Sequence, residues 1–294
     1  MKIVDFRLRP PLRGYLDTIM YSQAARRDRI TGFHGMTPAR SAQEKSIEML
    51  LKDMDEAGVT RGVAMGRYSG PYGTVSNEDV AAIVRDYPGR FIGVASIDPT
   101  DRRKAIRQIE DAKAAGLTGV NIEPGAYPMP LYADDRRLYP IYAYCEDNNV
   151  PVVMMAGGSA GPDLSYTMPV HVDRVAGDFP KMKLAISHGG WPWVHEILHV
   201  AFRRENVYLS PDQYLCGMPG TDEYVRAANG YLSDRFLYAS SYPFLCVKAY
   251  LAWFRTLPIR EAVMENLLCR NAEAFLGVRA ETAARAKGRP SKPG

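Results

Sequence analysis

The chain has few cysteines, and they are far apart. None of the four, Cys145, Cys216, Cys246 and Cys269, forms a CxxC pair with another. A disulfide framework or a zinc knuckle needs cysteines at short, regular spacings. The cysteine pattern therefore excludes the small disulfide-stapled folds, and it predicts reduced thiols in a cytoplasmic protein.

Long hydrophobic runs are also missing. No apolar run approaches the roughly 20 residues that span a bilayer. Met1-Lys-Ile-Val-Asp5 enters a predicted strand at once, so we expect no signal peptide and no membrane partner. The formal net charge is only +4, and the body of the chain shows no basic face interleaved with aromatic residues. We therefore expect no nucleic-acid partner.

The glycine-rich loops that hold nucleotides are absent as well. Neither GxGxxG nor GxxxxGK[ST] follows a predicted strand, so an open doubly wound sheet is only the alternative fold. What is present is a series of short apolar segments, each followed by helical spacing, and most repeat at roughly 25–35 residues as βα units do. About eight such units predict a (β/α)8 TIM barrel, with its site at the C-terminal ends of the strands. The barrel is expected as a single domain over residues 1–278.

Two segments interrupt the repeat. Residues 12–42 carry glycine, proline and several arginines, and they predict an inserted loop or lid with some helix. A loop that long in a compact domain usually serves function. Residues 279–294 are basic and lack large apolar side chains, which predicts a disordered tail. Within the repeat, Asn77 is the predicted cap of the helix after the second strand.

The stretch from Leu184 to Trp193, LAISHGGWPW, is the clearest example of a strand that ends in a functional residue. His188 follows a buried apolar strand, and Gly189 and Gly190 then turn the chain. Because a neutral imidazole titrates near physiological pH, His188 is the best candidate for a general acid or base. Polar residues also stand at the predicted ends of other strands: Arg7, Arg9, Arg67, Glu123, Asp212, Ser241 and Tyr242.

Several motifs, taken in their order and spacing, resemble the amidohydrolase superfamily in its amidohydrolase 2 (amidohydrolase-related) branch. They are Val4-Asp5, Glu56-Ala-Gly-Val59, Tyr139-Pro-Ile-Tyr142, Ser187-His-Gly-Gly-Trp-Pro-Trp193, Ser240-Ser-Tyr-Pro-Phe244 and Asn271-Ala-Glu-Ala-Phe-Leu276. The resemblance covers the chain from Ile3 to about Gly277. It implies a barrel of the metal-dependent-hydrolase type and hydrolysis or decarboxylation of small carboxylic acids. It also implies a possible homo-oligomer.

The metal ligands of that family are mostly replaced in this chain. In the family, the first strand ends in His-x-His, the fifth and sixth in His and the eighth in Asp. Here those positions fall on Arg7 and Arg9, on Met155 or its neighbour Met154, on His188 and on Ser241, so only His188 matches. Zinc needs three or four imidazole, thiolate or carboxylate ligands, whereas arginine offers only donors. We therefore expect a metal-independent site without a cofactor, with a single divalent metal such as zinc as the alternative.

Arginines at the positions of the metal ligands favour the binding of an anion at this site instead of a cation. Guanidinium groups bind carboxylates in a bidentate manner, so we expect a small anionic substrate. The expected reaction is hydrolysis of a lactone or a similar C–O or C–N bond, with His188 as the base. Ser241 and Tyr242 are expected to stabilise a developing oxyanion. The catalytic candidates are His188, Glu123, Ser241 and Asp212, and the substrate-binding candidates are Arg7, Arg9, Arg67, Tyr242 and Trp191.

The sequence is also compatible with other functions. The same scaffold suits a lactone isomerase, a non-oxidative decarboxylase or a barrel that only binds a ligand. The alternative to substrate binding by Arg7 and Arg9 is a structural role, in which they form ion pairs with Glu123 or Asp212. His195-Glu-Ile-Leu-His199 is a literal HExxH motif, although it falls on a predicted outer helix, where a zinc site is not expected.

Overall fold

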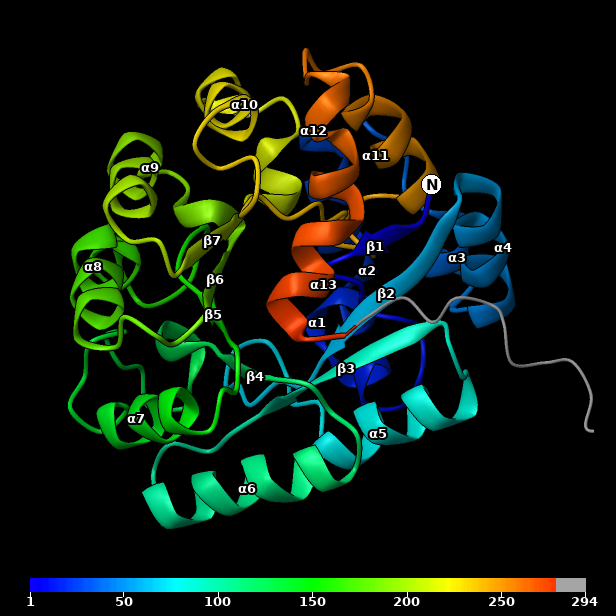
Figure 1. Cartoon of the computed structure of the whole chain (residues 1–294). Coiled ribbons are helices and arrows are strands. Elements are labelled where there is room, and N and C mark those ends of the chain that lie inside the picture. The colour runs from blue at the N-terminus through cyan, green and yellow to red at the C-terminus, as the bar shows by residue number, and fades with distance from the viewer. Residues whose placement is uncertain (279–294) are drawn as a thin grey trace, which may run out of the picture.

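The computed structural model describes residues 1–278, which form a barrel of parallel strands surrounded by helices (Figure 1). The predicted (β/α)8 TIM barrel is confirmed. Seven strands follow one another around the sheet in chain order, each parallel to the next. They are β1 (Ile3–Asp5), β2 (Val59–Met65), β3 (Phe91–Ser96), β4 (Val120–Ile122), β5 (Val152–Met155), β6 (Leu184–Ser187) and β7 (Val207–Ser210). The predicted disordered tail, 279–294, lies outside the described residues.

The eighth wall of the barrel is not a regular strand, although a strand is predicted at Arg235–Ala239. Phe236 forms an isolated parallel bridge with Leu209 of β7. On the other side, the N–H of Phe6 donates to the carbonyl of Tyr238 at 2.9 Å. These bonds close the ring between β7 and β1 with fewer ladder contacts than a full strand makes.

Asp5 reinforces this closure from β1. Its buried carboxylate accepts hydrogen bonds from the Ser240 hydroxyl at 2.5 Å, from the Ser240 N–H at 3.0 Å and from the Arg7 N–H at 3.2 Å. Burial raises the pKa of Asp5 to about 6, and the hydrogen bonds from Ser240 and Arg7 oppose that rise only in part. One side chain therefore joins the first and the last wall of the barrel.

We expect Asp5→Ala to lower the free energy of unfolding by about 3 kcal/mol or more, because each buried donor left unpaired costs roughly 1–3 kcal/mol. Urea unfolding at pH 7 measures the loss. Asp5→Asn is the matched control, since it keeps one acceptor oxygen and should lose less. The raised pKa of Asp5 means that its ionisation opposes folding as the pH rises from 3.8 through about 6. The stability advantage of the wild type over Asp5→Asn should therefore shrink over that range, and identical pH profiles would contradict the assignment.

Helices cover the outside of the barrel between successive strands. α4 shows how they pack: Leu50 and Met54 are buried against the sheet, Ser46 accepts the Met49 N–H at its start, and Gly58 ends it with a φ of 76°. The helices outside the inserted segment are α4 (Ile47–Ala57), α5 (Asn77–Asp86), α6 (Arg102–Ala114), α7 (Tyr139–Asp147), α8 (Pro169–Asp178), α9 (Val194–Arg203), α10 (Thr221–Asn229), α11 (Val247–Phe254), α12 (Glu261–Glu265) and α13 (Asn271–Leu276).

The predicted cap of α5 is wrong by one residue. Ser76, not Asn77, caps the helix, because its hydroxyl accepts the Asp79 N–H at 3.0 Å. The Asn77 side chain instead pairs with the backbone of Ser96 at the end of β3, accepting its N–H at 2.8 Å and donating to its carbonyl at 3.0 Å. An amide offers both a donor and an acceptor, which suits this pairing with a strand end.

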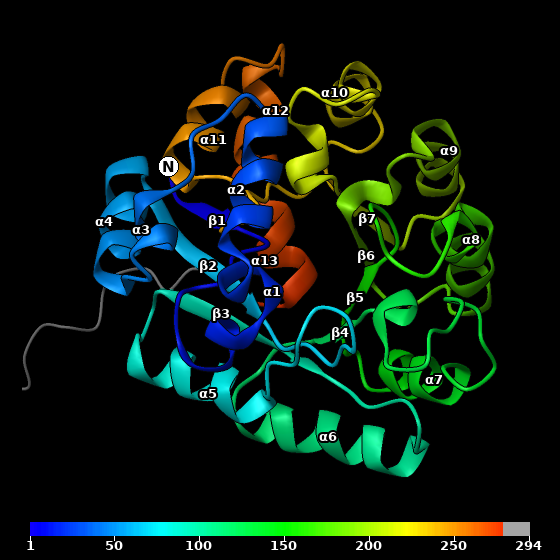
Figure 2. The same cartoon turned by 180° about the vertical axis from the view of Figure 1, so that it is seen from behind.

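The two ends of the barrel are covered differently. α13 lies across the end that faces the viewer in Figure 1, where Phe275 packs edge-on against Phe6 at 5.5 Å between ring centroids. Seen from behind, α1 (Ile19–Ser22) and α2 (Ala24–Phe33) lie over the other end (Figure 2). These helices and α3 (Arg40–Gln43) belong to the segment predicted as a loop or lid, which is mostly helical in the structure.

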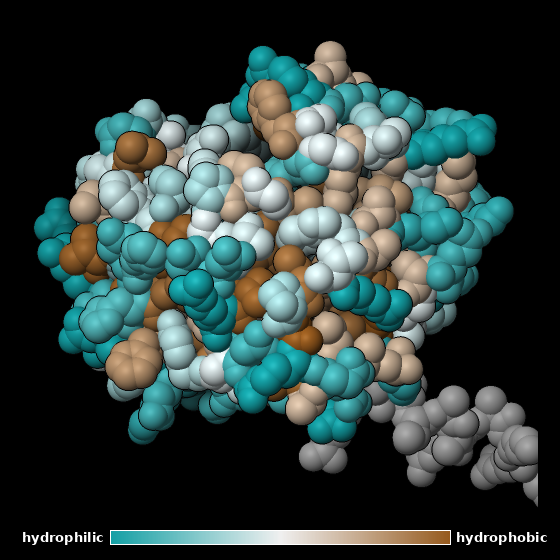
Figure 3. All heavy atoms as spheres, turned by 90° about the horizontal axis from the view of Figure 1, so that it is seen from above, coloured by the Kyte–Doolittle hydropathy of each residue, from teal (hydrophilic) through white to brown (hydrophobic). Residues whose placement is uncertain are grey.

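The surface of the described part mixes polar and apolar side chains. On the face shown in Figure 3, hydrophilic residues surround and separate the apolar ones. Large exposed apolar side chains such as Phe33 and Phe202 belong to different helices, α2 and α9. Within residues 1–278, no helix combines the length and the apolar character needed to cross a membrane.

Candidate active site

Three of the barrel's walls end in residues with a left-handed backbone. The φ angles are 63° for His188 after β6, 48° for Asp212 after β7 and 58° for Ser241 after the eighth wall. Residues other than glycine rarely adopt this backbone conformation. It persists only where the surrounding structure enforces it, and such residues cluster at functional sites. All three residues are catalytic candidates from the sequence, and all three lie at the same end of the barrel.

His188 and Asp212 form a buried pair. His188 Nδ1 lies 3.0 Å and 2.9 Å from the two carboxylate oxygens of Asp212. This contact places the proton on Nδ1 in the neutral imidazole and leaves Nε2 free to accept one. Burial lowers the pKa of His188, although Asp212 opposes the shift. His188 is therefore neutral near pH 7, as a general base must be.

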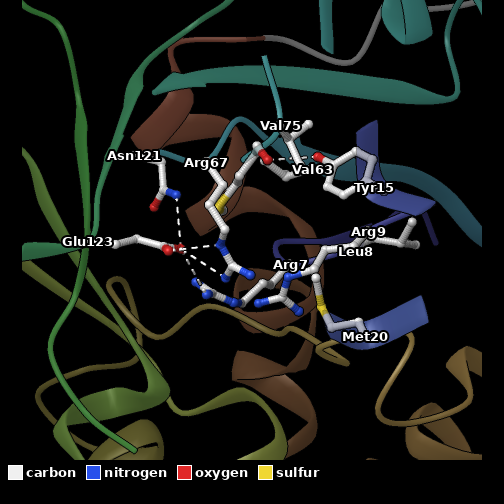
Figure 4. A pocket seen from close by; sticks show the side chains of 11 residues that line it. Arg7, Leu8, Arg9, Tyr15, Met20, Val63, Arg67, Val75, Asn121 and Glu123 are labelled. Atoms are coloured by element: carbon white, nitrogen blue, oxygen red, sulfur yellow. Dashed lines mark hydrogen bonds and ion pairs between the residues drawn. The ribbon is translucent and has the colours of Figure 1, made fainter. Parts of the chain in front are cut away.

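Glu123 contacts two of the predicted arginines, Arg7 and Arg67, and all three side chains line the pocket shown in Figure 4. Its carboxylate oxygens lie 2.8 Å from Arg67 Nε and 3.0 Å from Arg67 Nη2, and 3.6 Å from Arg7 Nη2. Burial acts to raise the pKa of Glu123, but Arg67 and Arg7 outweigh burial and lower it to about 2. Glu123 thus stays ionised at neutral pH. This arrangement suits an anchor for two guanidinium groups better than a proton donor.

Arg9 differs from the other two arginines because it is buried and no carboxylate among residues 1–278 forms an ion pair with it. Its exposed fraction is 6%, and the hydrogen bonds of its guanidinium go to the carbonyl of Ser241 at 3.4 Å and to the Ser241 hydroxyl at 3.3 Å. Burial lowers the pKa of Arg9 well below its usual value, and the positive charge of Arg7 adds to the effect. Arginine nevertheless keeps its proton in proteins. Its charge is therefore poorly compensated here, and a bound anion would compensate it.

A cavity of about 90 Å³ lies between the lid helices and the strand ends. Its size suits a small molecule, and it opens beside the narrower pocket of Figure 4, with which it shares Arg9, Met20 and Arg67. The residues around it are Arg9, Ile19, Met20, Arg26, Ile30, Arg67, Tyr72, Met155, Gly157, Ser159, Ala160, His188, Gln213, Tyr214 and Phe244. The lid helices α1 and α2 thus supply one wall, and the strand ends supply the other.

Three of the nine predicted site residues, Arg9, Arg67 and His188, line this cavity, and Arg7 and Glu123 line the adjoining narrower pocket. Asp212 and Ser241 contact His188 and Arg9, whereas Tyr242 and Trp191 line neither pocket. Tyr242 is fully buried, and its hydroxyl lies 3.2 Å from the Ser41 hydroxyl of α3. Trp191 stacks on Tyr214 at 4.9 Å between centroids, and its Nε1 donates to the Pro219 carbonyl at 3.2 Å. Both side chains therefore contact neighbouring segments and lie outside the cavity lining.

Twelve of the fifteen residues that line the cavity do not appear among the candidates from the sequence. Gln213 and Tyr214 directly follow Asp212, so their position beside a candidate is the signal that points to them. Met20, Arg26 and Tyr72 come from the lid and from the loop after β2. Their presence at the cavity depends on how those segments fold back, which no local pattern in the sequence indicates.

The side chains at the strand ends do not fit a divalent metal. Within the described residues, no group of three or more His, Cys, Asp or Glu side chains is placed to hold one. His188 and Asp212 bind each other, while Arg7 and Arg9 offer only donors. The HExxH motif does not supply a site either, because it lies on the outer helix α9. The side chain of His195 is 79% exposed there and lies 3.8 Å from Glu223.

Comparison with known proteins places this geometry in a family. A model of the amidohydrolase family matches residues 4–278. An uncharacterized TIM-barrel protein of Bordetella bronchiseptica is 50% identical and superimposes with a TM-score of 0.92 over 94% of this chain and 99% of that one. A 2,6-dihydroxybenzoate decarboxylase from Rhizobium shares the fold, with a TM-score of 0.70 at 15% identity over 94% of this chain and 99% of that one.

A curated relative matches only in part. The 2-keto-4-carboxy-3-hexenedioate hydratase of Sphingobium sp. is 24% identical over 171 residues, which are 51% of this chain and 50% of the relative. The chain thus matches about half the length of that relative. The match leaves the reaction open.

Proposed function

The chain belongs to the amidohydrolase family, and from this premise we propose that it hydrolyses a small carboxylate-bearing substrate, a lactone or a similar ester, without a metal. One observation carries the proposal: the neutral, Asp212-oriented His188 and the uncompensated Arg9 line the same cavity. A base and an anion-binding group side by side are what the hydrolysis of an acidic lactone needs.

The arginines bind the substrate carboxylate in this proposal. A guanidinium fork matches the two oxygens of a carboxylate. Arg9 is available for that contact because its guanidinium bonds only to Ser241 within the described part of the chain. Arg7 Nε and Nη1 are also buried without a hydrogen-bond partner, although Nε lies 3.7 Å from the Asp212 carboxylate, as an ion pair. An anion beside Arg7 and Arg9 would relieve the repulsion between the two guanidinium groups.

His188 and Asp212 perform the proton transfers. Nε2 of His188 takes a proton from a water molecule, whose oxygen bonds to the lactone carbonyl carbon. The ring C–O bond then breaks, and the imidazolium returns its proton to the leaving oxygen, so that one water is consumed and a hydroxy acid is formed. Asp212 stabilises the imidazolium. The Ser241 hydroxyl, 3.3 Å from Arg9 Nη1, donates to the developing oxyanion.

Metal removal tests the proposal directly. Protein purified without a histidine tag and treated with EDTA is assayed against a panel of carboxylated lactones, and its metal content is measured by plasma mass spectrometry. We expect hydrolysis at an unchanged rate and a metal content far below stoichiometric. Stoichiometric metal that is lost in His188→Ala, together with activity that depends on that metal, would show that ordinary metal-assisted hydrolysis operates instead.

Decarboxylation is the second candidate, because the Rhizobium decarboxylase shares the fold over nearly the whole chain. The two reactions leave different products. Hydrolysis in ¹⁸O-water places the label in a carboxylate, whereas decarboxylation releases CO₂ and places a solvent proton on carbon. Proton exchange at carbon without CO₂ release indicates a lactone isomerase, and ligand binding without turnover indicates a non-catalytic barrel. The expected homo-oligomer and the cytoplasmic location remain predictions.

A further inference from the structure

Arg26 is a cavity residue to which the reaction above assigns no role. It lies on the lid helix α2, and its side chain lines the cavity together with Arg9, Arg67 and His188. No aspartate or glutamate is among the lining residues. The cavity therefore has three guanidinium groups around it and no carboxylate of its own.

The three arginines differ in how well their charges are matched. Arg67 is paired with Glu123 at 2.8 Å. Arg9 has only the neutral oxygens of Ser241, at 3.3 Å and 3.4 Å. Across residues 1–278, no hydrogen bond or ion pair engages the Arg26 guanidinium. Two positive charges thus face the cavity without a partner in this part of the chain.

The two unmatched charges lie at different depths. Arg9 is buried at the end of the first wall, whereas Arg26 lies on the exposed side of the lid. The lid is fixed to the barrel, because the Thr31 hydroxyl of α2 donates to the carbonyl of Phe244 at 2.6 Å. Phe244 itself lines the cavity. Arg26 is therefore presented to the mouth of the cavity from an anchored helix.

We propose that Arg26 binds a second anionic group of the substrate, so that the substrate is a small dianion, such as a dicarboxylate, whose two charges reach from Arg9 to the lid. This inference rests on the proposed function, which supplies the first carboxylate contact at Arg9. Arg26 is then a specificity residue that distinguishes dianions from monoanions. It takes no part in the proton transfers.

The test measures binding of matched dianions and monoanions by calorimetry on the full chain. The probes are the straight-chain dicarboxylates from malonate to adipate, each paired with its monoamide, which has nearly the same shape and one charge less. We expect the wild type to bind at least one dicarboxylate about tenfold more tightly than its monoamide, as one charge-assisted contact provides. In Arg26→Met that preference should vanish while the affinity for the monoamide stays unchanged.

Arg29→Met is the matched control. Arg29 lies on the same helix with its guanidinium over the Phe33 ring, 5.8 Å from the centroid, and it does not line the cavity. It should keep the full preference for the dianion, and Arg26→Lys should keep part of it. A wild type without preference for any dicarboxylate in the series, or a preference that survives in Arg26→Met, overturns the inference.

Failure of the proposed function would look different. In that case Arg9→Met would leave the affinity for the monoamides unchanged, and the EDTA-treated enzyme would hydrolyse none of the carboxylated lactones. Arg9-dependent hydrolysis of lactones with a single carboxylate, without any preference for dianions, would leave the proposed function intact and remove only the role of Arg26.

Discussion

Replacing His188 with glutamine is expected to reduce kcat/KM for lactone hydrolysis by roughly 10²–10⁴-fold, the usual contribution of a general base. Glutamine has a similar reach and keeps a hydrogen bond to Asp212, but it cannot accept a proton at neutral pH. The fold should therefore be retained, and a thermal unfolding curve of the variant tests this. His199→Gln, a change on the exposed face of α9, is the matched control and should keep the wild-type rate.

The pH profile separates this role from a merely structural one. Because the pKa of His188 lies below its usual 6.5, kcat/KM should rise with pH on a limb centred below 6.5 and then level off. Asp212 acts to raise that pKa, so Asp212→Asn should move the limb to lower pH as well as slow the reaction. A rate that is unchanged in His188→Gln, or a limb that does not move in Asp212→Asn, would assign the base elsewhere.

Glu123→Gln is expected to be the most destabilising substitution in the site, with a loss of about 3–5 kcal/mol in the free energy of unfolding. Glu123 neutralises Arg67 at 2.8 Å and contacts Arg7 at 3.6 Å, and all three side chains are buried. Without it, two guanidinium groups remain inside the barrel with one fewer negative charge. Urea unfolding measures the effect, and adding Arg67→Met to Glu123→Gln should recover part of the loss.

The effect of Glu123 also has a defined pH dependence. Its pKa is lowered from 4.5 to about 2, so the stability it contributes is present above 4.5 and is lost as the pH falls toward 2. The difference between wild type and Glu123→Gln should shrink over that interval. Glu44→Gln is the control, because the ion pair of Glu44 with Arg40 is exposed and such pairs are worth about 0.5 kcal/mol. Equal losses in the two variants would contradict the assignment.

The fold was predictable because its signal repeats along the whole chain. Apolar strands alternating with amphipathic helices indicate a barrel even when one unit is irregular, as the unit around Phe236 is. The lid was only partly predictable. Residues 12–42 lack the helical periodicity that identifies α4, and their short helices form because they pack on the barrel.

The candidate site was also predictable only in part. Residues at strand ends, such as His188 and Asp212, were predictable because parallel strands bring their C-terminal ends to one edge. The direction in which the following side chain points was not predictable, as the residues after the eighth wall show. Ser241 has a left-handed backbone, and Tyr242 after it reaches Ser41 in the lid instead of the cavity. Nor does the sequence indicate that Glu123 reaches Arg67 and leaves Arg9 unmatched, since that depends on distances of a few ångströms.

The carboxylate of Asp5 has a consequence for how such an enzyme can diversify. It holds the backbone on both sides of the site, at Arg7 and at Ser240, so a change there moves both edges together. Arg26 and Met20 touch the same cavity from the lid and have no share in that closure. Substitutions at these lid residues can therefore change the cavity without disturbing the closure of the barrel, whereas a change at Asp5 alters both.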